Sequence, residues 1–400
     1  MLLGSYLCLL RMMKIKYINK ISDVPQLNPR EVQELEKVTN KFPFGANTYY
    51  LGLIDWEDKS DPIRRMIIPI TDELEEDTWG AVDPSSEADY TVAPGLQHKY
   101  PDTAIFLLSD LCGGRCRYCF RKRLFMQQRN HEILKDYRPA VQYLKEHSEI
   151  DNVLLTGGDP LRLATSSLNK VLSALRQVEH VQIIRVGTKM PVFNPFRVIG
   201  DPELPEVIKE FSTPEKRIYF MLHFSHPREI TGEAIEAANI LIESGAILCN
   251  QNPLLHGVND SPEVLAELFK RLSFIGVSPY YLFQVRPAVG NKPYAVPLVQ
   301  AYQIFQEARK NLSGTAKRAT FVMSHRLGKV EVVGLDDSNV YMRFHRAPDP
   351  EDAGKLIVCR RNDKGYWLDD FEIVSVVEGW PSRTPVASEA GELAAVSSRT

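Results

Sequence analysis

Three cysteines are grouped closely in the first half of the chain, with the spacing Cys112-x-x-x-Cys116-x-x-Cys119. They follow an apolar run, Ala104 to Leu108, that is typical of a buried β-strand. Three thiolates at this spacing can bind three irons of a [4Fe–4S] cluster and leave the fourth iron open. An open iron is a place for chemistry, because a structural metal site has all its positions filled by protein ligands.

Zinc is the alternative metal, since soft thiolates bind it as well. A structural zinc site usually takes four ligands as two spaced pairs, but there is no second Cys-x-x-Cys, and the next cysteine, Cys249, lies far along the chain. Gly113 and Gly114 inside the motif suit a backbone that folds closely around a cluster. The spacing therefore favours an iron–sulfur cluster, with zinc or ordinary buried cysteines as the alternatives.

The composition is that of an ordinary globular protein. The 400 residues are 44% hydrophobic and 25% charged, with a formal net charge of −3, so the overall charge does not indicate a nucleic-acid partner. The 6 cysteines are too few and too unevenly spread for a secreted disulfide framework. We therefore expect a cytoplasmic protein with a well-buried core, built as one large domain or two smaller ones.

The N-terminal segment Met1 to Leu10 is apolar but too short to span a bilayer. Basic residues follow this segment, whereas in a signal peptide they precede the apolar run. A true start at Met12 or Met13 explains the segment at least as well. No other segment is long and apolar enough to cross a membrane, so no membrane partner is expected.

Between about residues 100 and 312, strand-like and helical patterns alternate. The candidate strands are apolar runs typical of parallel strands buried on both faces, at Ala104–Ser109, Asn152–Thr156, Val181–Gly187, Ile218–Phe224, Ala246–Gln251 and Tyr280–Val285. The helices between them show apolar residues at the helical period, as in Leu265, Leu268 and Leu272. This alternation predicts an α/β fold, a partial (β/α)6 TIM-like barrel with its chemistry at the C-terminal ends of the strands.

The remaining segments are predicted to surround this barrel. Residues 1–95 form an N-terminal extension of loops with a helix from Asn28 to Lys41, and residues 96–328 form the barrel. Short apolar runs in residues 329–380 indicate a small antiparallel β appendage. The Ser-, Ala- and Glu-rich residues 381–400 are predicted to be a disordered tail.

The cysteine segment resembles the signature of radical S-adenosylmethionine enzymes, including the aromatic Tyr118 before the third cysteine. The wider sequence resembles the lysine 2,3-aminomutase branch of these enzymes. The matching stretches occur in the family's order between about residues 90 and 312, at Pro94–Asp102, Cys116–Arg123, Val153–Leu161, His223–Pro227, Asn250–Gln251, Gly257–Asp260 and Pro279–Tyr281. So many short motifs in one order make the resemblance specific.

The resemblance implies a mechanism. A [4Fe–4S] cluster on Cys112, Cys116 and Cys119 would chelate S-adenosylmethionine at its open iron and, once reduced, cleave the sulfonium. The resulting 5′-deoxyadenosyl radical would remove a hydrogen atom from a small-molecule substrate, amino-acid-like or anionic, while the protein orients the reactants and excludes water. The resemblance also implies an electron donor such as flavodoxin or ferredoxin, and it allows a homo-oligomer.

The resemblance further assigns residues to the cosubstrate. Gly157, Gly158 and Asp159 would meet the methionine amino group, since glycines allow close approach and a carboxylate can accept from an ammonium. Gly-Gly-Asp-Pro is also ordinary turn chemistry. His223 and Gln251, at the ends of two predicted strands, would face the cosubstrate, although a lone histidine is often a structural group.

Arg121 matches the family position that grips the substrate's α-carboxylate, which a guanidinium binds through two parallel hydrogen bonds. It belongs to a basic run with Arg115, Arg117, Lys122 and Arg123. The run could also be a solvated basic face or an RNA contact. No aromatic-rich strand accompanies it, so the nucleic-acid interpretation is the weaker one.

The later part of the chain departs from the family. Lysine aminomutases hold pyridoxal phosphate on a lysine that follows a Gly-rich stretch, but here the run from Thr320 to Ser324 leads to Lys329 without one. Lys329 could be that lysine after a shortened loop. A better registration matches this stretch to a later family strand and implies that the pyridoxal segment is deleted, so we prefer the deletion and keep pyridoxal phosphate as the alternative.

Other positions of the pyridoxal and substrate sites also differ. Lys99 and Thr103 stand where the family has arginines, and Phe283 stands for the tyrosine under the pyridine ring. Arg286 replaces the acidic residue that pairs with the terminal amine of a lysine substrate. An arginine there would repel lysine and attract an anion, so an acidic amino acid such as glutamate, or a different anionic substrate, is better matched.

The sequence thus predicts a radical S-adenosylmethionine enzyme resembling lysine 2,3-aminomutase, with Arg121 and Arg286 as anion contacts to the substrate. One alternative is a pyridoxal-phosphate-dependent 2,3-aminomutase that acts on an acidic amino acid and uses Lys329. The alternative from another class is a zinc-bearing protein that binds RNA through its basic run.

Overall fold

The computed structural model describes residues 15–75, 79–126 and 132–377. The predictions of a start at Met12 or Met13 and of a disordered tail over residues 381–400 fall outside these ranges. Within the ranges, the helices are all too short or too polar to cross a lipid bilayer.

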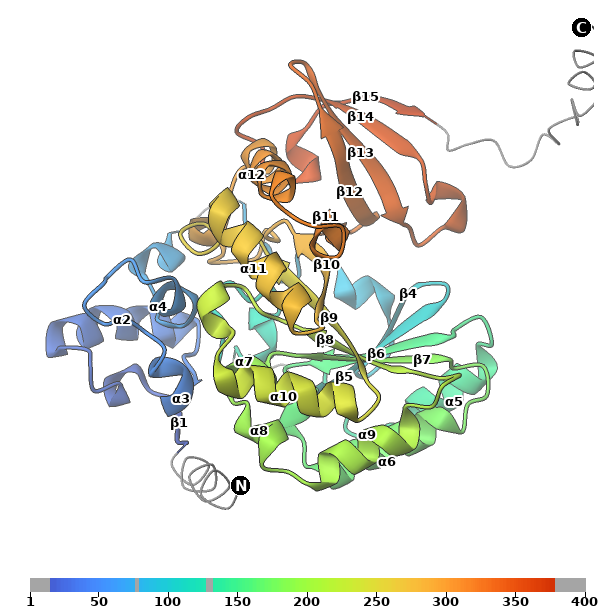
Figure 1. Cartoon of the computed structure of the whole chain (residues 1–400). Coiled ribbons are helices and arrows are strands. Elements are labelled where there is room, and N and C mark those ends of the chain that lie inside the picture. The colour runs from blue at the N-terminus through green and yellow to red at the C-terminus, as the bar shows by residue number, and fades with distance from the viewer. Residues whose placement is uncertain (1–14, 76–78, 127–131, 378–400) are drawn as a thin grey trace, which may run out of the picture.

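In the described residues, one continuous sheet of 13 strands, β3 to β15 in sequence order, organises the fold (Figure 1). Its central strands run parallel to one another. They are β5 (Thr103–Ser109), β6 (Asn152–Gly157), β7 (Ile183–Thr188), β8 (Ile218–Leu222), β9 (Ile247–Pro253), β10 (Ser278–Phe283) and β11 (Thr320–His325). The strand order is linear, so the α/β class and the partial barrel predicted from the sequence are confirmed.

The predicted strands correspond to β5 through β10, with ends that differ by about two residues or less. The strands β5 to β10 are each followed by at least one helix, which gives the six predicted strand–helix units, and β11 adds one further parallel strand. The stretch from Thr320 to Ser324 was predicted to match a later strand of the family, with a shortened pyridoxal loop as the alternative. In the structure, helix α12 (Leu298–Lys310) leads from β10 to β11 and makes one more strand–helix–strand unit.

Helices cover the outer face of the parallel strands (Figure 1). Besides α12, they are α5 (Arg138–Glu146), α6 (Thr165–Arg176), α9 (Glu203–Phe211), α10 (Gly232–Glu243) and α11 (Pro262–Phe274), with the short α7 (Met190–Phe193) and α8 (Phe196–Ile199) after β7. Ser261 begins α11 by accepting a hydrogen bond from the backbone of Val264. Leu265, Leu268 and Leu272 form its buried stripe, as the helical period requires.

The inner faces of the parallel strands line a cavity. In β7, Ile184 and Val186 are buried in the core, whereas Arg185 and Gly187 line the cavity. Because side chains alternate along a strand, neighbouring strands also present residues to the cavity at every second position, for example Thr156 of β6. The strands were expected to be buried on both faces; the outer face is buried against the helices, whereas the inner face lines the cavity with polar as well as apolar side chains.

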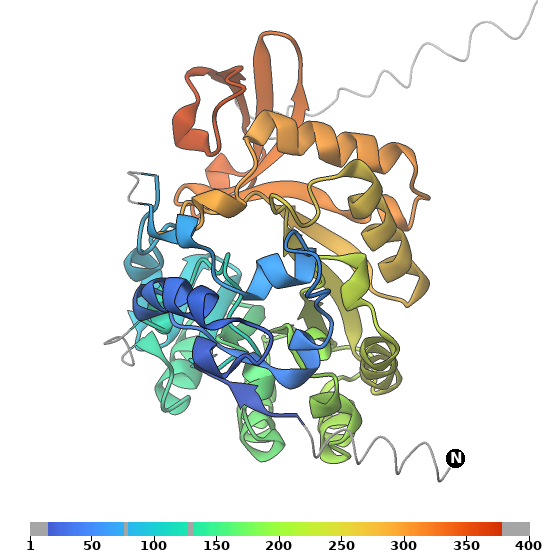
Figure 2. The ribbon, with the colours of Figure 1, turned by 90° about the vertical axis from the view of Figure 1, so that its left-hand side faces the viewer.

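The N-terminal extension packs over one end of the barrel. It contains β1 (Tyr17–Ile18), α2 (Pro29–Lys41), β2 (Ala46–Asn47), α3 (Thr48–Leu51) and α4 (Pro62–Ile67), and Figure 2 shows these blue elements in front of the ring of strands. Helix α2 confirms the predicted helix, with Asn28 and Glu31 forming a capping box. Asn47 donates hydrogen bonds to the carbonyl oxygens of Gly113 (2.9 Å) and Phe193 (2.8 Å), so the extension holds the cysteine loop in place.

Antiparallel strands flank the parallel ones at both ends of the sheet. Strands β3 (Thr91–Ala93) and β4 (Leu96–Tyr100) precede β5, and β12 (Gly328–Leu335), β13 (Asn339–Arg346), β14 (Leu356–Arg360) and β15 (Ile373–Val377) follow β11. The last four strands form the antiparallel appendage at the predicted place. The appendage is continuous with the barrel, because β12 pairs with β11, and it contributes Lys329 and Arg346 to the cavity.

Candidate active site

All three cysteines of the motif line a single cavity of about 330 Å³. Their loop follows the C-terminal end of β5, which is the end of a parallel barrel where active sites form. In the described part of the chain, no three His, Cys, Asp or Glu side chains are arranged to bind a single metal ion. The structure therefore brings the three cysteines to one cavity without itself showing a formed metal site.

Burial raises the pKa of the cysteine thiols. For Cys116 it raises the pKa to about 11, although the Lys189 ammonium acts in the opposite direction. At Cys112 burial again has the largest effect, and the Asp159 carboxylate adds to it. A metal stabilises thiolates at such a place and displaces their protons. We therefore expect metal or cluster binding here to weaken as the pH falls.

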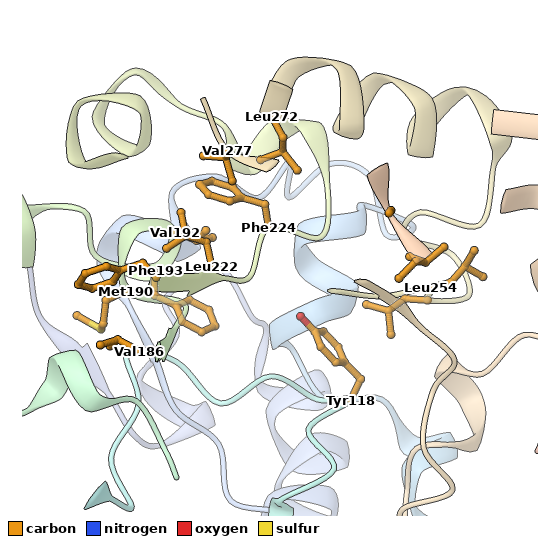
Figure 3. Close-up of a cluster of buried hydrophobic side chains, with 14 of the residues drawn as sticks. Tyr118, Val186, Met190, Val192, Phe193, Leu222, Phe224, Leu254, Leu272 and Val277 are labelled. Atoms are coloured by element: carbon orange, nitrogen blue, oxygen red, sulfur yellow. The ribbon is translucent and has the colours of Figure 1, made fainter. Parts of the chain in front are cut away.

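The two glycines of the cysteine loop are required by its packing on α7. A Cβ atom on Gly113 would lie 2.7 Å from the sulfur of Met190 and 2.8 Å from Cβ of Phe193, and one on Gly114 would lie 2.8 Å from the Phe193 ring. Figure 3 shows Met190 and Phe193 together with Val192 in the buried apolar layer that supports the loop. The sequence predicted that these two glycines let the backbone fold closely around a cluster. In the structure, they let the backbone of the cysteine loop approach α7 closely.

The Gly157-Gly158-Asp159 turn follows β6 and lies against the start of the cysteine loop. Gly157 has φ of +115°, and a Cβ atom there would lie 2.6 Å from the carbonyl oxygen of Ser109. A Cβ atom on Gly158 would lie 2.5 Å from the carbonyl oxygen of Leu111. The backbone N–H of Asp159 donates to that same oxygen at 2.7 Å. Both glycines therefore allow the turn and the cysteine loop to meet.

Gly157→Ala should lower the free energy of unfolding by about 1–3 kcal/mol, because the residue needs a positive φ and has no room for a methyl group. The matched control is Gly232→Ala in the first turn of α10, where a Cβ atom meets nothing within 4 Å. That variant should stay within about 1 kcal/mol of the wild type. Denaturant unfolding is the measurement, and equal stability of the two variants would contradict the strain assigned to Gly157.

The carboxylate of Asp159 joins the turn to the end of β7. One oxygen accepts from the Thr188 hydroxyl (2.7 Å) and from the Leu161 backbone (3.0 Å), and the other accepts from the Lys189 backbone (2.8 Å). Three of about four acceptor positions are thereby used. The predicted contact between Asp159 and a methionine ammonium has to use the remaining acceptor position of the carboxylate. That contact stays a prediction.

Burial raises the pKa of Asp159 from 3.8 to about 6, although its hydrogen bonds act in the opposite direction. The folded protein therefore holds a proton that the unfolded chain has already released. The contribution of Asp159 to the free energy of unfolding should fall as the pH rises from about 4 to about 6 and stay constant above that. Asp159→Asn removes the titration, so the stability of the wild type relative to this variant should decrease over that window. Urea unfolding at stepped pH tests this, and a pH-independent difference would rule it out.

A buried hydrogen-bonded network beside the cysteine loop was not predicted. The Tyr118 hydroxyl lies 3.1 Å from Nε2 of His223 and 3.2 Å from the Lys189 ammonium. Lys189 forms an ion pair with Glu229 at 2.8 Å, and Tyr50 donates to the same carboxylate at 2.6 Å. Burial, assisted by the charge of Lys189, lowers the pKa of His223 well below its ordinary value, so its ring is neutral. No spacing of residues indicates these pairings, because they join residues far apart in the chain.

Arg121 lines the cavity but is already paired. Its Nη2 and Nε donate to the Glu87 carboxylate at 2.8 and 3.1 Å, and its Nη1 donates to the Thr156 hydroxyl at 3.2 Å. Arg123 donates to the same carboxylate at 2.5 Å. Although burial raises the pKa of Glu87, the two guanidinium groups hold it well below its ordinary value. Sequence reasoning did not find Glu87, which lies in a segment without a recognisable motif.

The basic run around Arg121 is interior. The Arg117 side chain is 2% exposed and forms an ion pair of 2.7 Å with Glu73, and the Lys122 ammonium lies 3.5 Å from the same carboxylate. Arg123 is equally buried and pairs with Glu87 and Glu132. The interpretation of this run as a solvated face or an RNA contact is therefore wrong, because its charges are neutralised inside the protein.

Arg286 lies just after β10 and also lines the cavity. Its guanidinium lies 3.6 Å from the centre of the Phe120 ring and donates to the Ser85 hydroxyl at 2.8 Å. Burial lowers the pKa of Arg286 to about 10, and it lowers the pKa of Lys99 on β4 to about 8, assisted by the charge of Arg286. These two cations therefore share a region of the cavity wall.

Lys329, at the start of β12, lines the cavity as well, with its ammonium 3.9 Å from the centre of the Tyr281 ring. Burial lowers its pKa well below the ordinary value, and repulsion from Arg185 and Arg346 adds to the effect. In the described residues no carboxylate pairs with it. The deletion of the pyridoxal segment stays a prediction, and Lys329 lies in the wall of the same cavity as the cysteines.

A search with protein-family models finds no match. A protein of Aquifex aeolicus provisionally named L-lysine 2,3-aminomutase is 49% identical over 90% of this chain and 95% of its own length. The chain belongs to the lysine 2,3-aminomutase family. Within that family, the L-lysine 2,3-aminomutase of Clostridium subterminale is 32% identical over 75% of this chain and 71% of its own. The glutamate 2,3-aminomutase of Clostridioides difficile is 34% identical over 76% of this chain and 70% of its own.

A solved radical SAM methyltransferase from Sphaerobacter thermophilus aligns with a TM-score of 0.40 and 19% identity, over 61% of this chain and 70% of that chain. No conclusion rests on so distant a likeness. Membership of the lysine 2,3-aminomutase family confirms the predicted resemblance, and it confirms that the protein is an enzyme.

In this lysine 2,3-aminomutase family member, one cavity brings together every residue that the sequence assigned to the site, while their individual roles stay predictions. These residues are Cys112, Cys116, Cys119, Gly157, Gly158, Asp159, His223, Gln251, Arg121 and Arg286. The cavity also contains residues that sequence reasoning did not assign to it, namely Glu87, Arg185, Lys189 and Arg346. These four additions are all charged residues, and they contribute strongly to the electrostatics of the site.

Proposed function

We propose that the chain binds a [4Fe–4S] cluster on Cys112, Cys116 and Cys119, cleaves S-adenosylmethionine reductively, and catalyses 2,3-amino migration on an amino acid with an acidic side chain. The observation that carries this proposal is that the three cysteines, the Gly157–Asp159 turn and a strongly cationic wall share one cavity. A cosubstrate held at the cysteines would lie in the same enclosed space as a substrate held at the cations.

The donor set fits the cluster, because three free cysteines converge on one cavity and thiolates are the ligands that iron–sulfur clusters use. When bound, the cluster and S-adenosylmethionine supply the electron and the 5′-deoxyadenosyl radical that abstracts hydrogen. The residues of the chain position these groups and exclude water. Gly157 and Gly158 keep the wall next to the cysteines free of side chains, and the neutral ring of His223 is available as a hydrogen-bonding group.

The charge of the cavity favours an acidic substrate. Its cationic lining residues outnumber the acidic ones, Glu87 and Asp159, and they are Lys99, Arg115, Arg121, Arg185, Lys189, Arg286, Lys329 and Arg346. The terminal ammonium of lysine would be repelled there, whereas a second carboxylate would be attracted. The similarity to a glutamate 2,3-aminomutase agrees with this choice.

Arg286→Gln should raise the KM for an acidic amino acid by about tenfold to a hundredfold, with a smaller effect on kcat. The variant removes one charge-assisted hydrogen bond, which contributes about 1.5–3 kcal/mol. Steady-state kinetics of the reconstituted enzyme make the measurement. Arg343→Gln on β13, whose side chain is 47% exposed and pairs with Glu331, is the matched control and should leave the KM unchanged. An unchanged KM in both variants would remove Arg286 from the substrate site.

Lys329 fits pyridoxal phosphate as a second cofactor. Burial and repulsion from neighbouring cations lower the pKa of Lys329, so its amine loses its proton more readily than that of an ordinary lysine, and the uncharged amine is the form that condenses with an aldehyde and releases water. Phe283 lines the cavity 5.4 Å from the Lys329 amine and offers an apolar surface for the pyridine ring. When bound, this cofactor supplies the conjugated ring that carries the migrating amino group. These contacts favour the pyridoxal alternative over the deletion.

Transfer of label tests the choice of substrate. The enzyme, reconstituted anaerobically with iron, sulfide and pyridoxal phosphate, is reduced with S-adenosylmethionine and deuterated glutamate, aspartate or lysine. Mass spectrometry of 5′-deoxyadenosine should show deuterium from an acidic amino acid and little from lysine. Efficient transfer from lysine alone would overturn the acidic preference while leaving the radical chemistry in place.

A further inference from the structure

A further pocket, of about 240 Å³, lies between α12, the short 3-10 helix η9 (Ala316–Arg318) and the strands β11 and β12, and we call it the outer pocket. Helix α12 packs on β11, where the rings of Phe305 and Phe321 lie 5.8 Å apart (Figure 1). The outer pocket includes Thr320, the first residue of β11, whereas the cysteines follow the C-terminal end of β5. Because the strands from β5 to β11 run parallel, the outer pocket lies at the opposite end of the barrel from the cysteine loop.

Three cations line the outer pocket, namely Arg309, Lys317 and Arg318. Arg309 comes from the last turn of α12, and the other two come from η9. Arg309 and Lys317 are half-buried, whereas Arg318 is exposed. In the described part of the chain none of the three forms an ion pair, although the neighbouring Lys310 pairs with Glu307 at 2.5 Å. Three positive charges therefore meet here without a carboxylate to balance them.

Glu331 is the acidic residue of the outer pocket, and it is already engaged elsewhere. Its carboxylate accepts from Arg343 at 2.6 Å and lies 3.5 Å from Nδ1 of His345. Although burial raises the pKa of Glu331, these two partners lower it overall. Since Arg343 neutralises this carboxylate, the positive charge of the outer pocket remains available to a ligand.

Two of the guanidinium groups are held in place by their surroundings. That of Arg309 lies 5.2 Å from the centre of the Phe305 ring, and that of Arg318 donates to the Ser278 hydroxyl at 2.9 Å. A planar fork of N–H donors matches the oxygens of a phosphate, and the Lys317 ammonium adds a point charge. The volume is below the roughly 300–1,000 Å³ of sites for drug-sized ligands. It suits a phosphate group with few further atoms.

We propose that the outer pocket binds a small phosphate-bearing anion, inorganic phosphate or a small phosphate monoester, through Arg309, Lys317 and Arg318. The bound anion joins the end of α12 to η9 and to the strands beneath them. These strands continue into the catalytic cavity, which Ser324 of β11 and Lys329 of β12 line. The site uses none of the residues that line the catalytic cavity, so the inference is independent of the proposed function.

Binding of inorganic phosphate tests the inference without any turnover. Phosphate is titrated into the purified full chain by calorimetry at constant ionic strength, because added salt alone screens exposed cations. The catalytic cavity is cationic as well, so two classes of binding site are expected. Arg309→Gln and Arg318→Gln should each raise the dissociation constant of one class about tenfold or more. Arg286→Gln, which changes the catalytic cavity, should leave that class unchanged.

Arg360→Gln is the matched control, because Arg360 lies on β14, is 61% exposed and pairs with Glu372 at 3.2 Å. It should bind phosphate like the wild type. If a glutamine variant fails to fold, as judged by circular dichroism, Arg309→Lys and Arg318→Lys replace it. These variants keep the charge without the fork, and they should still bind phosphate more weakly than the wild type.

A crystal soaked in tungstate, a heavy tetrahedral oxyanion, locates the site. Anomalous density between Arg309 and Arg318 is the expected result, and density confined to the catalytic cavity would overturn the inference. Glycerol phosphate distinguishes the two sources of the anion. Tighter binding of this monoester would identify an organic ligand, and tighter binding of phosphate itself would identify the inorganic ion.

The remaining outcomes overturn the proposal. Phosphate affinity that is unchanged in Arg309→Gln and Arg318→Gln, or reduced equally in Arg360→Gln, would show that the outer pocket is not a specific site. Malonate that binds as tightly as phosphate would refute the preference for a phosphate group. Each of these results would leave the cysteine motif and the proposed reaction untouched, because they concern a different pocket.

Discussion

Replacing Cys112, Cys116 or Cys119 by alanine should lower the iron bound after anaerobic reconstitution from about four atoms per chain to near background, and abolish the release of 5′-deoxyadenosine. With three protein ligands and one open iron, loss of any ligand leaves the cluster held by two. The burial that raises the pKa of these thiols also means that two thiolates cannot easily hold their charge without the full cluster. Iron and sulfide analysis, the visible spectrum and chromatography of the nucleoside make the measurement.

The control for the cysteine series is Cys249→Ala. Cys249 lies on β9 and is half-buried, and it does not line the cavity. The Cys249→Ala variant has the same cysteine-to-alanine change as the motif variants. It should keep the iron content and the nucleoside release of the wild type. Full iron content in a motif variant, or equal losses in the control, would show that the motif is not the cluster site. One zinc per chain in the wild type would support the zinc alternative instead.

Lys329→Ala should abolish the pyridoxal phosphate adduct and reduce amino migration by a factor on the order of a thousand or more, as expected when a group that acts covalently is removed. The same variant should retain its cluster and continue to cleave S-adenosylmethionine, because Lys329 lies on β12 and not in the cysteine loop. Loss of one of several neighbouring cations should also leave the free energy of unfolding unchanged or increased. The adduct spectrum, the nucleoside assay and denaturant unfolding together provide the measurement.

Two results would contradict the role of Lys329. An adduct of the same intensity in Lys329→Ala would place the cofactor on another amine, and mass spectrometry after borohydride reduction would identify it. Normal amino migration in a variant that forms no adduct would restore the interpretation that the pyridoxal segment is deleted. Lys329→Arg keeps the charge but cannot condense with the aldehyde in the same way, so it distinguishes covalent chemistry from charge alone.

The parts of the molecule encoded by local patterns could be predicted from the sequence. Apolar runs located the parallel strands, and Asn28 with Glu31 marked the start of α2. The cysteine spacing and the ordered motifs located one wall of the cavity. Strand β11 was not counted among the barrel strands, although its run was matched to a later strand of the family, and helix α12 leads the chain from β10 to this neighbouring position.

The charge pairing of the site could not be predicted, because it depends on residues far apart in the sequence. Glu87 neutralises Arg121 from the N-terminal extension, and Arg346 reaches Thr103 from a strand at the other end of the sheet. Neither partner lies in a motif. The basic run therefore resembled a surface patch in the sequence, although its charges are buried and paired in the folded chain.

Reductive cleavage of S-adenosylmethionine tests the central claim most directly. The anaerobically reconstituted protein is reduced in the presence of the cosubstrate, and 5′-deoxyadenosine is quantified against the Cys116→Ala variant. The predicted result is release of the nucleoside and methionine by the wild type and none by the variant. A wild-type protein that binds iron and sulfide but releases no more nucleoside than the variant would contradict the assignment of an open iron at Cys112, Cys116 and Cys119.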